Sequence, residues 1–214
     1  MTKPVSESRR IDIIRGAMAA LRKQGLAYPS YDAIADEANM SRQLIRHYFP
    51  DAEALMEMTG QALAMAYKEI FAQAILDTDE TERLPMFLDF YFDFLSEKGL
   101  PKPADDAVYD ALFALAARSE KVRAELKGQY SLLRMILAHE IQISTRLPQR
   151  ACEDLAFLVV SLMYGHWKMV ATLGFDRGLN RVSRDAVDRL IASYRDRYED
   201  PDEEPDGLPP EDGA

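Results

Sequence analysis

The side chains best suited to binding another molecule lie in one stretch, residues 30–49 of the 214-residue chain. Ser41 is a good N-cap for a helix over 42–48, and the apolar Ile45 and Phe49, four residues apart, would bury one face of that helix. The outward positions are then polar, namely Arg42, Gln43, Arg46 and His47. Arginine can bind guanine and glutamine can bind adenine through paired hydrogen bonds in the major groove, so the pattern predicts a DNA-reading helix.

A second short helix is predicted directly before this one. Ser30 can cap a helix over 31–38, and Asn39 suits the left-handed residue that ends it. Two short helices joined by a tight turn form a helix-turn-helix. Arg42 and Gln43 would reach base edges, while hydroxyl and imidazole groups would hold phosphates. We expect DNA contacts from Ser30, Tyr31, Ser41, Arg42, Gln43, Leu44, Arg46, His47 and Tyr48.

Residues 9–55 resemble the N-terminal module of the TetR family of transcriptional regulators. The matching residues are Arg9, Arg10, Ile14, Ala17, Gly25, Ser30, Ile34, Ala35, Ala38, Ser41, His47, Tyr48, Phe49 and Leu55. The chain departs from the family pattern at Asn39, Leu44, Arg46 and Ala52. Leu44 cannot hydrogen-bond a phosphate, although it can contact a thymine methyl group.

The resemblance implies an all-α homodimer in which residues 1–50 bind DNA and residues 51–199 bind a small-molecule effector and dimerise. The operator would be pseudo-palindromic double-stranded DNA, and effector binding would release the protein from it, as in a repressor. Two alternatives stay open. One is a helical adaptor whose helix-turn-helix no longer binds DNA, and the other is a small-molecule-binding bundle.

The chain offers no pattern that favours an enzyme or a metalloprotein. Its three histidines are not spaced four residues apart, and Cys152 is the single cysteine. No Ser-His-Asp or Cys-His spacing stands out. We therefore expect no catalytic residue, no metal site and no cofactor.

Helical periodicity, which would position these side chains, runs along most of the sequence. It predicts an all-α fold of about nine helices, with an N-terminal three-helix unit and a larger C-terminal helical bundle. The expected ranges are 6–24, 31–38, 42–48, 52–76, 82–96, 104–117, 120–145, 149–173 and 184–198. Ser183 is the expected cap of the last helix, and the acidic, proline-rich residues 200–214 are expected to be a disordered tail.

Charge is distributed unevenly along the chain. The formal net charge is −10, yet residues 1–49 carry a net charge of +3. A basic N-terminal part is compatible with nucleic-acid binding in spite of the acidic whole. The apolar segment 155–175 contains His166 and Lys168, which argues for a helix buried on most sides rather than a membrane span. With no signal-like leader, we expect a cytoplasmic protein without membrane contact.

Aromatic residues of the C-terminal part are the candidates for an effector cavity, as the resemblance implies. They and their neighbours are Phe87, Tyr91, Phe94, Tyr109, Phe113, Met135, His139, Met163 and Trp167. Asp89, Asp93 and Asp110 lie in or near aromatic stretches, where a carboxylate suits a cationic ligand. The alternative for these aspartates is a solvent-facing position.

The last two expected helices are candidates for a dimer interface. The helix over 149–173 is apolar around most of its circumference, so one face can serve the monomer core and another a second subunit. Two helices from each chain would form a four-helix interface. The expected interface residues are Leu155, Leu158, Leu162, Val187, Leu190, Ile191 and Tyr194. A larger monomeric bundle is the alternative.

Overall fold

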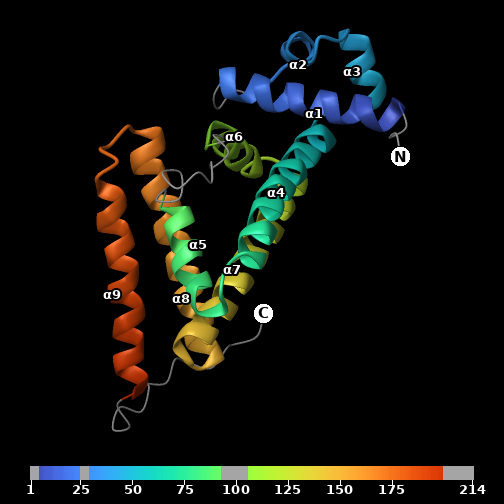
Figure 1. Ribbon diagram of the computed structural model, residues 1–214. Coiled ribbons are helices and arrows are strands. Elements are labelled where there is room, and N and C mark those ends of the chain that lie inside the picture. Colours follow the sequence, from blue (N-terminus) through green and yellow to red (C-terminus); the bar gives the residue numbers. More distant parts are fainter. Residues whose placement is uncertain (1–4, 25–28, 93–105, 200–214) are drawn as a thin grey trace, which may run out of the picture.

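The computed structural model describes residues 5–24, 29–92 and 106–199 (Figure 1). Every regular element within these residues is helical, so the expected all-α class is confirmed. The elements are α1 (Val5–Gln24), α2 (Tyr31–Ala38), α3 (Arg42–Tyr48), α4 (Ala52–Leu76), η1 (Glu80–Glu82), α5 (Arg83–Tyr91), α6 (Asp106–Ala116), α7 (Glu120–Thr145), α8 (Gln149–Trp167), η3 (Lys168–Thr172) and α9 (Leu179–Glu199). Phe94, Asp93 and the acidic tail lie outside the described residues.

Helices α1, α2 and α3 form the N-terminal unit, with α2 and α3 lying on one side of α1 (Figure 1). Its core contains Ile13, Leu21, Ile34 and Ile45, which are all buried. Gly16 lies where α1 meets the end of α2, and a Cβ added there would come within 2.7 Å of the Ala38 Cβ. Real Cβ atoms do not approach so closely, so the spacing of the two helices depends on a glycine at this position.

Helix α4 leads from the N-terminal unit into the C-terminal bundle, as Figure 1 shows. There α7 packs against α4, α5, α6 and α8, while α9 packs along α8 at the edge of the molecule. Buried aromatic and aliphatic side chains from α4, α5, α6 and α8 surround α7 and continue the core of the N-terminal unit. The arrangement gives α7 contact with most of the bundle.

Side-chain caps begin four of the helices, and two of these caps, Ser30 and Ser41, are the ones expected from the sequence. The side chains of Ser30, Ser41, Asp51 and Ser119 each accept a backbone N–H in the first turn of α2, α3, α4 and α7. These four helices cover the predicted ranges without a shift. Ser30 and Ser41 thus mark the starts of α2 and α3, as expected.

The expected start of the last helix was wrong, because α9 begins at Leu179 rather than after Ser183. The Ser183 hydroxyl lies 2.8 Å from His166 Nδ1, and the other ring nitrogen lies 3.0 Å from Asn180 Oδ1. His166 and Asn180 are both buried, and a buried imidazole needs such partners. Ser183 therefore joins α9 to α8 instead of capping a helix.

Helix α8 also differs from its prediction, since the α-helix ends at Trp167 and residues 168–172 continue as a π-helix. Lys168, in this turn, forms an ion pair with Asp110 of α6. Among residues 5–24, 29–92 and 106–199, no helix is long and apolar enough to cross a membrane.

Candidate functional site

The turn between α2 and α3 is held by a short set of backbone and side-chain hydrogen bonds. The Ser30 hydroxyl accepts the Ala33 N–H at 3.1 Å, and the Ser41 hydroxyl accepts the Leu44 N–H at 3.2 Å. Asn39 has φ 51° and ψ 50°, the left-handed conformation expected for it. The Met40 N–H then donates to the Ala35 carbonyl at 3.0 Å and closes the end of α2. The result is a rigid, tight helix-turn-helix.

Helix α3 presents its polar side chains to solvent. Ile45 is fully buried against the rest of the unit, whereas Leu44 and Tyr48 are half-buried. Arg42, Gln43, Arg46 and His47 are exposed. One face of this seven-residue helix therefore carries two guanidinium groups, an amide and an imidazole. The helix contains no acidic side chain.

Two of these side chains are already engaged within the N-terminal unit. Arg42 Nη1 donates to Asp32 Oδ2 at 3.1 Å, and the Arg46 guanidinium lies 5.4 Å from the centre of the Tyr31 ring. Both partners belong to α2, so the two arginines are oriented across the turn. Because Arg42 and Asp32 are exposed, their pairing is weak and can be exchanged for a contact with DNA.

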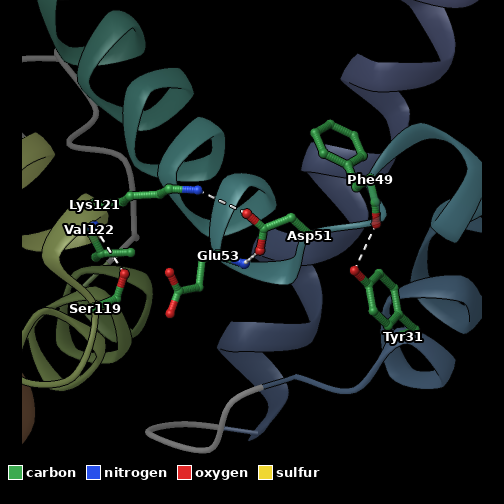
Figure 2. Close-up of polar contacts among 7 residues, drawn as sticks. All are labelled: Tyr31, Phe49, Asp51, Glu53, Ser119, Lys121 and Val122. Atoms are coloured by element: carbon green, nitrogen blue, oxygen red, sulfur yellow. Dashed lines mark hydrogen bonds and ion pairs between the residues drawn. The ribbon is translucent and has the colours of Figure 1, made fainter.

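The Tyr31 hydroxyl has an internal partner that the sequence did not reveal. It donates to the Phe49 carbonyl at 2.7 Å, as Figure 2 shows. Burial raises the pKa of Tyr31 above its ordinary value, so the phenol stays protonated. A hydroxyl has one proton to donate, and a phosphate contact through Tyr31 would have to break this bond. The hydroxyls of Ser30 and Ser41 act as acceptors in their caps, which leaves their protons for a phosphate.

A cavity of about 730 Å³ lies in the C-terminal bundle between α4, α5, α6, α7 and α8. Five residues expected to line a ligand cavity do line it: Phe87, Tyr91, Tyr109, Met163 and Trp167. Further lining residues include Gln61, Tyr67, Lys68, Glu125, Gln129, Tyr130 and Tyr164. These further lining residues could not be predicted from the sequence, because local patterns do not show how α4 is aligned against α7.

The other expected cavity residues lie elsewhere. Met135 is 63% exposed and His139 is exposed, because both lie on the solvent face of α7, four residues apart. Phe113 does not line the cavity but supports its wall, with its ring centre 5.5 Å from Tyr130 and 4.8 Å from Tyr164.

The aspartates considered for a cationic ligand already bind other parts of the chain. Asp89 pairs with Arg184 of α9 at 3.0 Å. Asp110 pairs with Lys168 and also accepts the Thr172 hydroxyl at 3.2 Å. The carboxylate on the cavity wall is instead Glu125 of α7. Across the described part of the chain, no three His, Cys, Asp or Glu residues cluster as metal ligands would.

Comparison with protein families identifies the N-terminal unit. Residues 13–58 match the family model described as bacterial regulatory proteins, tetR family. The helix-turn-helix is a TetR-type module. The match runs from α1 into α4, which are the elements that position α3, and it confirms the resemblance seen in the sequence. No curated protein matches the chain by sequence.

The likeness to solved structures extends over most of the chain. A protein from Pseudomonas aeruginosa PAO1 named as a transcriptional regulator gives a TM-score of 0.71 at 20% identity, over 92% of this chain and 96% of that one. A TetR transcription regulator from Haloarcula marismortui ATCC 43049 gives 0.68 at 18% identity, over 88% and 98%. A protein from Saccharomonospora viridis, named as a transcriptional regulator and crystallised with choline, gives 0.69 at 18% identity, over 87% and 96%. These likenesses establish a TetR-like fold for the chain.

Helices α8 and α9 also carry exposed apolar residues. Phe157 is 56% exposed and Leu158 is 39% exposed, and Leu179 and Val182 of α9 are also exposed. Of the expected interface residues, Leu162, Leu190 and Tyr194 are half-buried, whereas Leu155, Val187 and Ile191 are buried in the core of this same chain. Those three cannot contact a partner without opening the core, so a partner would meet the exposed residues.

Proposed function

We propose that the protein is a DNA-binding transcriptional regulator, a homodimer that releases its operator when a small molecule occupies the C-terminal cavity. The observation that carries the proposal is helix α3, with Arg42, Gln43, Arg46 and His47 exposed on one face of a TetR-type module. Paired hydrogen bonds from arginine to guanine and from glutamine to adenine give such a helix the means to select a sequence.

Roles follow from position on α3. The start of a recognition helix lies deepest in the major groove, so Arg42 and Gln43 contact base edges. Arg46, one turn later, contacts a base or a flanking phosphate, and Leu44 contacts a thymine methyl group. Phosphates are held by the hydroxyls of Ser30, Ser41 and Tyr48 and by the His47 imidazole. The Tyr31 hydroxyl supports Phe49 instead, so Tyr31 meets DNA through its ring edge or after exchanging that bond.

Exposed apolar residues on α8 and α9 support the homodimer part of the proposal. An interface through α8 would bury the exposed side chains of Phe157 and Leu158 from both subunits. It would also present two copies of α3. Two-fold symmetric readers recognise a pseudo-palindromic site, with half-sites about one helical turn apart or a multiple of it.

The effector role of the cavity is supported by its size and by its connection to the module. A volume of about 730 Å³ is ample for a small organic molecule. A protein with a similar fold, from Saccharomonospora viridis, was crystallised with choline. Helix α7 lines the cavity and also carries Lys121, which pairs with Asp51 at the start of α4. An occupant that moves α7 therefore acts on the helix that follows the TetR-type module.

Selection of duplexes from a random pool by the full-length protein tests the proposal. We expect enrichment of an inverted repeat, and loss of that enrichment when Arg42 and Gln43 are both replaced by alanine. Binding that shows no sequence preference, or that survives this double replacement unchanged, would exclude α3 as the reading helix.

An adaptor function remains the second candidate, and one observation favours it. Asp51 and Glu53 place two exposed carboxylates at the start of α4, and Glu53, unlike the Lys121-paired Asp51, would repel a phosphate backbone there. In that case the selection would return no enriched sequence, while the dimer would still form.

A further inference from the structure

We propose that the effector is a protonated organic amine, with its ammonium group at Glu125 and its apolar part among the tyrosines of the cavity. This inference rests on the proposed regulator function only in calling the ligand an effector. Four observations carry it: the partners of Glu125, an unpaired acceptor beside it, the chemistry of the rings, and the position of Lys68, a cationic lining residue.

Glu125 is held by neutral groups from two helices. Gln61 Nε2 of α4 donates to one carboxylate oxygen at 3.1 Å, and Gln129 Nε2 of α7 donates to the other at 2.8 Å. No lysine or arginine in the described part of the chain forms an ion pair with Glu125. Amide donors orient a carboxylate and carry no charge that would neutralise it. The negative charge at the cavity wall is therefore left for a ligand.

Gln129 adds an acceptor beside this carboxylate. Its Oε1 is buried and has no hydrogen-bond partner, although its Nε2 is bound to Glu125. A buried carbonyl oxygen without a protein donor is an acceptor that a ligand can use. An ammonium group offers up to three N–H donors and could bond both Glu125 and Gln129 Oε1. A hydroxyl offers only one donor, and a carboxylate offers none.

The rest of the wall suits a cation with an apolar body. Tyr67, Tyr91, Tyr109, Tyr130 and Tyr164 all line the cavity. Burial raises the pKa of Tyr91 and of Tyr130 well above the ordinary value, so these phenols stay neutral. Neutral aromatic rings attract cations through their faces and bury apolar groups equally well. The rings can therefore hold both the charge and the apolar part of an organic cation.

Among the described lining residues, Lys68 is the cationic one, and it lies away from Glu125. It is exposed, and it follows Gln61, the donor to Glu125, by seven residues along α4, which is about 10 Å along the helix axis. The hydrogen-bond partners of Glu125 are the Gln61 and Gln129 amides, so Lys68 does not neutralise this half-buried carboxylate. A second polar group on a long ligand could reach it.

Trp167 allows the inference to be tested without knowing the natural ligand. It is the single tryptophan of the chain and lines the cavity, with its indole N–H donating to the Tyr91 carbonyl at 2.7 Å. Ligand entry should therefore change the tryptophan fluorescence. Suitable probes share one carbon skeleton and differ in charge: 4-phenylbutylamine, 4-phenylbutanol and 4-phenylbutyrate, each titrated into the full-length protein at pH 7.

We expect 4-phenylbutylamine to bind at least about tenfold more tightly than 4-phenylbutanol, and 4-phenylbutyrate to bind most weakly. The Glu125→Gln variant, which keeps the shape of the side chain, should lose about tenfold in affinity for the amine and little for the alcohol. Glu120→Gln, an exposed change on the same helix, is the matched control and should alter neither. Circular dichroism checks that both variants keep the helical fold.

Equal binding of the amine and the alcohol, tightest binding of the acid, or an unchanged amine affinity in Glu125→Gln would each show the inference to be wrong. Release of the selected duplex, followed by fluorescence anisotropy, separates this inference from the proposed function. If the amine binds and the duplex stays bound, the ligand class stands and the effector role fails. If a neutral or anionic compound releases the duplex and the amine does not bind, the regulator stands and the ligand class is wrong.

Discussion

The Asp51 carboxylate caps α4 and at the same time pairs with Lys121 of α7, with Oδ1 2.9 Å from the Glu53 nitrogen and Oδ2 3.0 Å from Lys121 Nζ (Figure 2). The Lys121 hydrogen bond, followed by the Glu53 N–H, lowers the pKa of Asp51, and the same bond raises the pKa of Lys121. Both side chains are exposed, so the pair adds little to stability. The pair matters because it connects two parts of the molecule. Asp51 lies two residues after Phe49, at the end of the TetR-type module, and Lys121 lies one turn of α7 before Glu125, on the cavity wall.

This placement predicts that Lys121→Met weakens communication between the cavity and the DNA. Methionine keeps a long apolar stem and removes the charge, so the fold and the DNA affinity without ligand should change little, within about twofold. The reduction in DNA affinity caused by a cavity ligand should become smaller. Anisotropy titrations with and without ligand measure both quantities. Lys127→Met, an exposed change on the same helix, is the control, and an equal effect in both variants would contradict the prediction.

Glu140 of α7 gives a prediction about pH. Its side chain is only 5% exposed, one carboxylate oxygen has no hydrogen-bond partner, and burial raises its pKa. A raised pKa in the folded state means that the contribution of Glu140 to stability is fully present below the ordinary value of 4.5 and is lost as pH rises through the folded value. We therefore expect Glu140→Gln to raise the free energy of unfolding at pH 7, with a smaller gain near pH 4.5.

Urea unfolding of wild type and variant at several pH values measures that difference. Glu69→Gln, an exposed change on α4, serves as the control and should show no such pH dependence. A gain that persists unchanged at low pH would mean that shape, and not charge, is responsible.

Base readers and phosphate contacts on α3 should respond differently to substitution. Arg42→Ala or Gln43→Ala should each cost about 1–3 kcal/mol on the selected site and relax the preference at one base pair per half-site. Tyr48→Phe keeps the packing and removes one hydroxyl, so binding should weaken about equally on all sequences. A panel of single-base variants of the site distinguishes these outcomes. If the Arg42 and Gln43 variants weaken binding uniformly while Tyr48→Phe shifts base preference, α3 is rotated from the proposed placement.

Tyr31→Phe tests the internal role of a residue that the sequence suggested as a phosphate contact. The change removes the donor to the Phe49 carbonyl and should lower the free energy of unfolding by about 1 kcal/mol. Thermal or urea unfolding measures it. An unchanged stability, accompanied by weaker DNA binding, would instead assign the Tyr31 hydroxyl to DNA.

Two neighbouring residues of α8 separate dimerisation from folding. Phe157 is exposed, so Phe157→Asp should give a folded monomer, seen as one chain mass by light scattering. Leu155 is fully buried, so Leu155→Asp should abolish the folded state itself, with a loss of helical signal. A dimeric Phe157→Asp protein would place the interface elsewhere.

Local signals predicted the fold well and the cavity only in part. Ser41 and Asp51 fix the starts of α3 and α4 within a few residues of sequence, so these helices could be read directly. The role of Ser183 could not, because it depends on His166, seventeen residues away on another helix. Glu125 was missed for the same reason, since its amide partners come from both α4 and α7.

An all-round apolar helix poses a related difficulty. Leu155 and Leu158 look alike in the sequence of α8, yet the first is buried in the monomer core and the second is 39% exposed. Periodicity indicates that both faces are apolar, but only the packing of α9 on α8 decides which face is left for a partner.

The close approach at Gly16 has a consequence for how operator preference could diversify. Any larger side chain there would push α2 away from α1, and the helix-turn-helix formed by α2 and α3 would shift with it. Positions 42, 43 and 46 carry no such restriction, because their side chains are exposed. Exchanging those three residues should therefore yield proteins with new target sequences and an unchanged fold. The exposed positions of α3 are thus the ones to vary when engineering a new DNA preference.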